Sequence, residues 1–135
     1  MKRIQIRTRR PRRGFFSMEL VLTLPILGVV LFALFEFSLL FSARGEIVEA
    51  ARVGARTACL PGAEVADVED SVRRVLGPRL RDNVYVDVQL GDHSGDLVAV
   101  AVHVPMEIAA PDLLWPIGYS IRDRQLFSET RMIRE

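Results

Sequence analysis

The feature that most constrains this chain is an apolar run over residues 20–41, which reads LVLTLPILGVVLFALFEFSLLF. Its only charged residue is Glu36. As a helix rising ~1.5 Å per residue, the run is about 33 Å long, enough to cross a hydrocarbon core of ~30 Å. Pro25 and Gly28 are unfavourable in a soluble helix but common in membrane helices. We predict a transmembrane helix; the alternative is a buried core helix, although no other segment could surround it.

The charges before this run predict its orientation. Seven of the 18 basic residues lie in the first 13 positions, with no acidic residue among them, and the rest of the chain has a net charge of −6. Basic flanks stay in the cytoplasm, so residues 44–135 should lie outside. Arginine runs can also bind nucleic acid, but a bilayer begins a few residues later, and we expect no nucleic-acid partner. The run is longer than a secretory signal and lacks a clean cleavage site, which favours an uncleaved anchor.

Glu19 is a carboxylate directly before the apolar run, five residues after Gly14. One interpretation is a surface carboxylate stabilised by the positive end of the helix dipole. The other begins with a cut after Gly14, which would give Phe15 a charged amino group at the membrane surface. In a packed array of helices, Glu19 of one subunit could neutralise that amine on the next and reduce the desolvation cost of both charges.

The basic leader, Gly14, Phe15, Glu19 and the apolar run together resemble a type IV prepilin. The resemblance implies that a membrane aspartyl prepilin peptidase cuts between Gly14 and Phe15 on the cytoplasmic side.

The next segment narrows the resemblance. Residues 35–58, FEFSLLFSARGEIVEAARVGARTA, resemble the TadE-like minor pilins (pseudopilins) of tight-adherence pili, which are Flp-type and type IV-like. The similarity lies in the Glu36-Phe37 pair, in AARVGARTA over 50–58, and in the terminal RMIRE, whose order differs from the family's usual ending. The implied function is pilus assembly for surface attachment and biofilm formation. The implied location is the bacterial inner membrane, with entry into surface pili left open.

By the same resemblance, the partners are a prepilin peptidase, the inner-membrane assembly platform, a sister minor pilin and the major pilin. Two alternatives stay open. One is an unprocessed single-pass membrane-anchored binding or sensing module, and the other is a minor pseudopilin of a type II secretion machine.

The helix should continue beyond the membrane until Pro61-Gly62. Small residues recur on one face at helical spacing, which lets another backbone approach closely. That face either forms a packing spine between subunits or packs on the chain's own domain. For Glu36, within the span, we prefer a polar partner on another subunit over a marker of the outer interface. The small residues of the face include Ala50, Ala51, Gly54 and Ala58.

The remaining residues predict a small α+β head. Apolar spacing over 64–76 indicates a short amphipathic helix, and alternation over 84–90 and 97–104 indicates a β-hairpin. A third strand is expected at about 125–134. The apolar, proline-rich loop 105–120 is either an exposed interface or a lid on a small core. The expected organisation is therefore a basic leader (1–14), a transmembrane and extended helix (15–60) and a head with a three-stranded antiparallel sheet (61–135).

Nothing in the chain predicts catalysis. Cys59 is the only cysteine, which excludes an intramolecular disulfide and a cysteine zinc cluster. Asp92, His93 and Asp96 could suggest a metal loop, but a turn explains them more simply. No nucleophile, base and orienting group cluster together, so we expect neither an enzyme nor a cofactor or metal.

Overall fold

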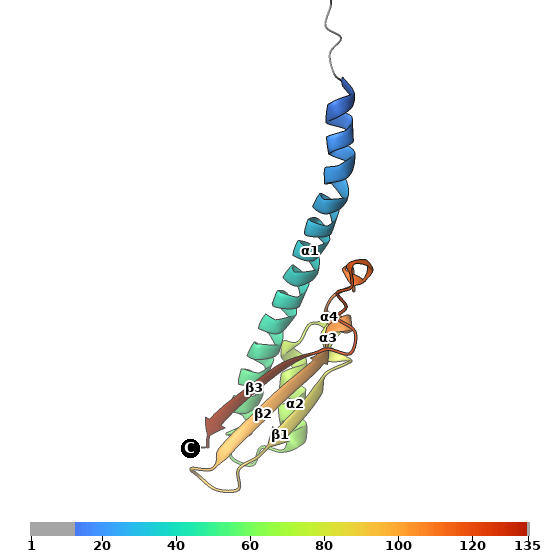
Figure 1. The fold of residues 1–135 in the computed structure, drawn as a ribbon. Helices are drawn as coiled ribbons and strands as arrows, with labels where there is room; N and C mark the ends of the chain where they lie inside the picture. The colour runs from blue at the N-terminus through green and yellow to red at the C-terminus, as the bar shows by residue number, and fades with distance from the viewer. Residues whose placement is uncertain (1–12, 135) are drawn as a thin grey trace, which may run out of the picture.

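A computed structural model describes residues 13–134, and Figure 1 shows one long helix that carries a small head along its second half. The helix, α1 (Arg13–Ala58), is continuous through Pro25. A turn at Pro61-Gly62 follows it, as the sequence predicts. Gly62 adopts a φ of 75°, a left-handed conformation that glycine reaches without steric cost.

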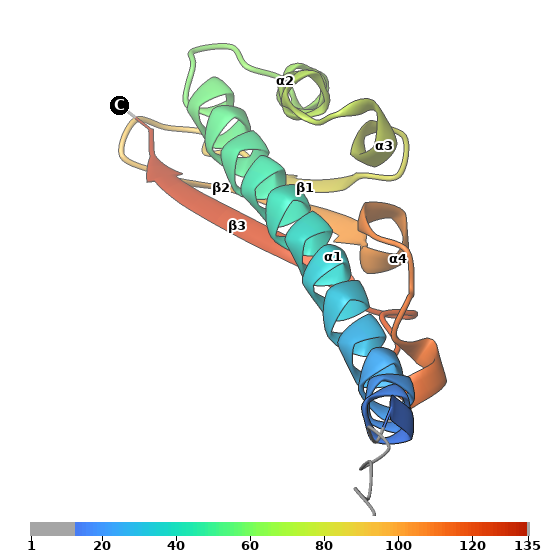
Figure 2. The same ribbon diagram turned by 90° about the horizontal axis from the view of Figure 1, so that it is seen from above.

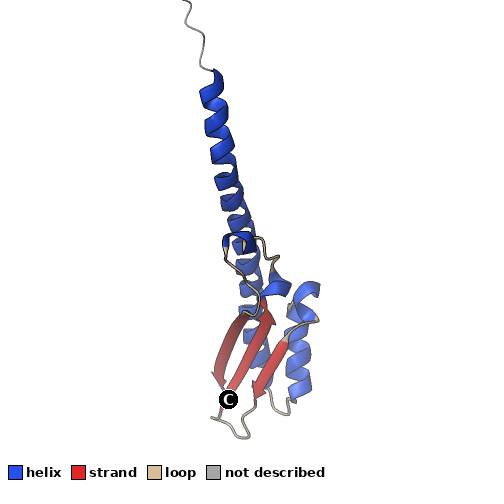
Figure 3. Ribbon diagram, turned by 45° about the vertical axis from the view of Figure 1, so that its right-hand side comes forward, coloured by secondary structure: helices blue, strands red, loops and turns tan. Residues whose placement is uncertain are grey.

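The head has the predicted α+β composition, with a short helix and an antiparallel sheet (Figure 3). The sheet has three strands in the order β1-β2-β3. Val100 in the central strand pairs with Val88 on one side and Thr130 on the other. Three single-turn helices were not anticipated from the sequence. The elements after α1 are α2 (Val65–Val75), α3 (Pro78–Arg81), β1 (Tyr85–Gln89), β2 (Leu97–Pro105), α4 (Met106–Ala109), the 3-10 helix η1 (Trp115–Ile117) and β3 (Gln125–Ile133).

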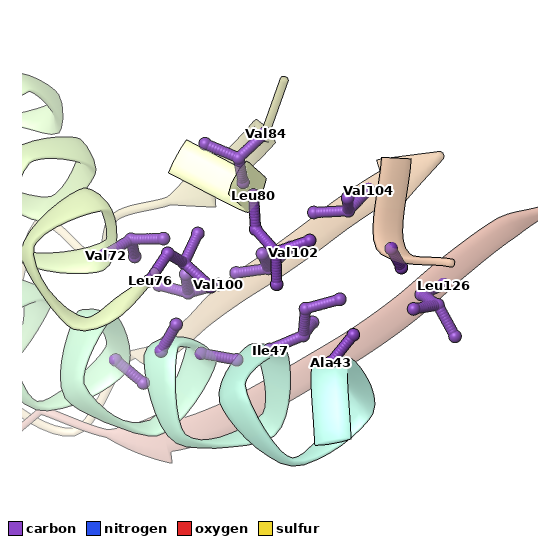
Figure 4. Packing of buried hydrophobic residues seen from close by; sticks show 14 of the residues in the cluster. Ala43, Ile47, Val72, Leu76, Leu80, Val84, Val100, Val102, Val104 and Leu126 are labelled. Carbon is purple, nitrogen blue, oxygen red and sulfur yellow. The ribbon is translucent and has the colours of Figure 1, made fainter. Parts of the chain in front are cut away.

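The core lies between one face of the sheet and the two helices α1 and α2, which run over that face (Figure 2). The alternation predicted for β2 places four valines on this face, all fully buried, opposite Ile47 of α1 (Figure 4). The second half of α1 is therefore part of the head's own core. The four valines are Val98, Val100, Val102 and Val104.

The small-residue face of α1 is buried against the chain's own head, including Ala50, Ala51, Gly54 and Ala58. A Cβ placed on Gly54 would lie 2.7 Å from Cγ2 of Val72 in α2. Of the two interpretations of this face, the structure shows intramolecular packing. The spine between subunits is not available to these residues, because α2 and the sheet already cover them.

Candidate functional site at the junction of helix and head

The first half of α1 is apolar and uncovered. Its large apolar side chains from Met18 to Phe35 are 48–73% exposed, except that of Val29, which is half-buried. Among the described residues, this helix is the one long and apolar enough to cross a membrane, with a mean hydropathy of 2.4 in its most apolar window. Only 6% of that window is buried, so the alternative of a buried core helix is wrong in this fold. An apolar rod of this kind fits a single-pass membrane anchor.

The residues of the predicted processing site lie at the start of this rod. α1 begins at Arg13, which places the backbone of Gly14 and Phe15 in its first turn. Leader residues 1–12 lie outside the described residues. The side chain of Glu19 is exposed. The backbone carbonyl oxygen of Glu19 accepts a hydrogen bond of 2.7 Å from Oγ1 of Thr23. Cleavage at Gly14-Phe15 and an assembly role for Glu19 stay predictions.

Glu36 is fully buried at the point where the head begins to cover α1. Its Oε2 accepts hydrogen bonds from the backbone N–H groups of Leu113 at 2.8 Å and Leu114 at 3.2 Å. Its Oε1 is also buried and has no hydrogen-bond partner among the described residues. The sequence favours a partner on another subunit, but the structure supplies an intramolecular one. Nothing in the sequence marks two leucine amides as that partner, since every residue except proline carries one.

The loop that binds Glu36 is fixed by further contacts on both sides. The Tyr119 ring packs on Phe37 of α1 with centroids 5.8 Å apart, and the Arg124 guanidinium lies 5.4 Å from the Tyr119 centroid. Oγ of Ser120 donates a 2.8 Å hydrogen bond to Oδ2 of Asp112. We call residues 111–119 the junction loop. It lies against α1 where the exposed apolar half of the helix meets the head.

The junction loop combines both roles expected of it from the sequence. Leu114 is buried and helps to close the core, as a lid would. Trp115 and Ile117 in η1 are 63% and 58% exposed, as an interface would be. A proline-rich apolar stretch predicts neither outcome residue by residue, because burial depends on which side chains meet α1.

The outer face of the sheet is a second exposed surface. The rings of His103 and Phe127 lie 4.8 Å apart on it. Next to them, Nε of Arg131 donates a hydrogen bond of 2.5 Å to Oε1 of Glu129. This hydrogen bond, together with charge attraction to the same carboxylate, raises the pKa of the Arg131 guanidinium. An arginine is cationic at any physiological pH.

The hairpin turn after β1 shows the turn chemistry that the sequence favours over a metal loop. Oδ2 of Asp96 accepts a 2.9 Å hydrogen bond from the backbone N–H of His93, and Gly95 has a φ of 93°. Within residues 13–134, no group of three or more His, Cys, Asp or Glu side chains is placed to hold a metal ion. Cys59 is a free, half-buried thiol.

Fold and site together define a class: a small α+β head built onto the second half of a helix whose first half is an exposed apolar rod. Residues 14–56 match the family model described as TadE-like protein. This match confirms the resemblance predicted from the sequence over the segment that contains Gly14, Glu19, Glu36 and the buried small residues, and it implies a protein associated with tight-adherence pili. Neither the curated proteins nor the solved structures compared with the chain gave a match.

Proposed function

We propose that the protein is a minor pilin, cut after Gly14 by a prepilin peptidase, that takes part in assembling tight-adherence pili for surface attachment and biofilm formation. It is anchored in the inner membrane by the first half of α1, with its N-terminus in the cytoplasm and its head outside. Its partners are the assembly platform, a sister minor pilin and the major pilin, and its role is structural. The family match over residues 14–56 carries this proposal, because one segment joins the cut site to the membrane rod.

The structure supports this proposal physically through the exposed half of α1. Its apolar side chains are uncovered, so in water they would favour either lipid or other apolar helices. Glu19 is exposed about one helical turn from the amino group that cleavage would create on Phe15. In a low-dielectric environment a carboxylate and an ammonium are costly alone and far less costly as a pair.

The first prediction concerns processing. Material recovered from isolated membranes and from sheared surface fibres is expected to begin at Phe15, as read by N-terminal sequencing or intact mass. Gly14→Ala should block the cut, because a peptidase that binds the backbone closely at this position has no room for a Cβ. Gly28→Ala is a matched control, since a Cβ there meets nothing within 4 Å. Normal pili built from an uncut Gly14→Ala protein would contradict the proposal and favour an unprocessed anchored module.

The second prediction concerns Glu19. Glu19→Ala should leave the cut intact and lower the number of pili several-fold, because the new amine on Phe15 would lose its carboxylate partner. Glu19→Gln keeps the size of the side chain and should assemble as poorly, whereas Glu49→Ala, an exposed glutamate on the same helix, should assemble normally. Pili are counted by electron microscopy of cells that contain equal amounts of processed protein. Normal pilus numbers with Glu19→Ala would contradict the proposed pairing of Glu19 with the amino group of Phe15. A defect in protein secretion alone would instead indicate a role in type II secretion.

A further inference from the structure

The exposed apolar surface of α1 ends beside the junction loop. The exposed side chains from Met18 to Phe35 span about 27 Å at ~1.5 Å per residue, close to a hydrocarbon core of ~30 Å. Phe41 is also exposed, and we infer that the outer boundary of a bilayer around this helix lies between Phe35 and Phe41. Glu36 and Phe37, which hold the junction loop, lie in that interval.

The tip of the junction loop is apolar and turns toward the membrane side of the head. In Figure 1 it extends beyond α4 toward the N-terminal half of α1. Its exposed large apolar side chains are those of Trp115 and Ile117. Tryptophan is enriched at membrane–water interfaces because its ring is apolar and its indole N–H can still reach a polar partner.

The loop is held in this position rather than free to fold away. The hydrogen bonds to Glu36 fix one end, and the ring contact between Phe37 and Tyr119 fixes the other. Arg122 lies just beyond the loop with a side chain that is 71% exposed, 3.4 Å from Asp112. A guanidinium at this height is well placed for lipid phosphates, which arginine binds by paired hydrogen bonds.

We propose that Trp115 and Ile117 enter the headgroup region of the outer surface of the membrane that α1 crosses. The junction loop is then a second lipid contact that sets the height and tilt of the head. A bilayer is the occupant that the structure favours, because the loop tip continues the lipid-facing surface of α1 at the level where that surface ends. This inference rests on the proposed membrane anchoring, and its test measures that anchoring separately.

Trp115 is the only tryptophan in the chain, so its fluorescence reports on the loop directly. The protein that begins at Phe15, with its whole helix and head, is reconstituted into vesicles of phosphatidylcholine and phosphatidylglycerol. Its insertion is verified by flotation. Lipids brominated near the headgroup should quench Trp115 several-fold more strongly than lipids brominated at the chain centre. Acrylamide in the aqueous phase should quench it weakly.

The matched control moves the tryptophan to the far end of the head. In the background Trp115→Phe, the substitution His93→Trp places the reporter in the hairpin turn, where the His93 side chain is 87% exposed. This reporter should respond to acrylamide and not to brominated lipid. Ile117→Asp in the otherwise unchanged chain should reduce lipid quenching of Trp115, with unchanged circular dichroism, because a charge is costly in the apolar part of the interface.

Two results would overturn the inference while leaving membrane anchoring intact. In floated vesicles, Trp115 could be as open to acrylamide as the reporter at position 93 and insensitive to brominated lipid, which would place the loop in water. It could also be shielded from both quenchers, which would mean that protein covers it. Loss of flotation would instead count against the anchoring itself, and so against the inference as well.

Discussion

Glu36→Ala is expected to lower the free energy of unfolding of the head by about 3 kcal/mol. Hydrogen bonds contribute ~0.5–1.5 kcal/mol each, and Glu36 accepts two, from Leu113 and Leu114. The substitution also leaves the buried N–H of Leu114 without its acceptor and opens a cavity under the junction loop. Loss of the unpartnered Oε1 offsets part of this cost. For a head of this size, the expected fall in Tm is roughly 10 °C or more.

The measurement is thermal unfolding of the full chain in detergent, followed by far-ultraviolet circular dichroism, with Trp115 emission as a local reporter. Glu36→Gln is the informative comparison, because its amide oxygen can still accept from the same two N–H groups. We expect it to retain more than half of the stability that Glu36→Ala loses. If both variants unfold like the unchanged protein, Glu36 does not hold the junction loop, and a partner on another subunit again becomes its better explanation.

Gly54→Val is expected to destabilise the head by about 3 kcal/mol, because the site has no space for a side chain. A Cβ there would lie 2.7 Å from Cγ2 of Val72 and 3.1 Å from Cγ1 of Val100. Both valines are fully buried, and a β-branched side chain in a helix has one strongly preferred rotamer, so Val72 cannot turn aside. Overpacking of this kind typically costs ~1–3 kcal/mol, and valine adds two further methyl groups to the clash.

A second glycine in the same helix separates this clash from helix propensity. Gly45 lies within α1 with nothing within 4 Å of a Cβ, so Gly45→Ala should stabilise the helix by ~0.5–1 kcal/mol. Gly54→Ala should have the opposite sign. Combining it with Val72→Ala frees the space that the new Cβ needs, so the two changes should couple by about 1 kcal/mol in a double-mutant cycle. Equal stabilisation by Ala at both glycines would contradict close packing of α1 on α2.

The packing of α1 on its own head limits the surfaces that the proposed assembly could use. The small-residue face of α1 is occupied by its own head, so the proposed contacts with other subunits would use the exposed apolar half of the helix or the outer surfaces of the head. Glu19 belongs to the exposed half and Glu36 to the covered half. Of the two glutamates proposed for assembly, only Glu19 is therefore accessible to a neighbour without opening the fold.

The sequence by itself determined those features that depend on local chemistry. A long apolar run has to be a helix in lipid, because only a helix satisfies its backbone hydrogen bonds within one segment. Alternating valines predicted two strands with their buried faces. The end of α1 shortly before Pro61-Gly62 followed from residues that cannot continue a helix. The element order and the α+β class came from these patterns, each readable within a window of a few residues.

Only the tertiary structure decided which surface of each element meets which partner. The sequence at Ala50 and Gly54 is the same whether a neighbouring subunit or the chain's own α2 covers them. A stripe of small residues indicates how closely another backbone can approach, but not which backbone that is. Glu36 looked like an unpaired membrane charge because its partners, the amides of Leu113 and Leu114, are 77 and 78 residues away in the chain. Because every residue except proline has a backbone N–H, the sequence does not indicate which one binds a buried carboxylate. The packing of the whole head decides it.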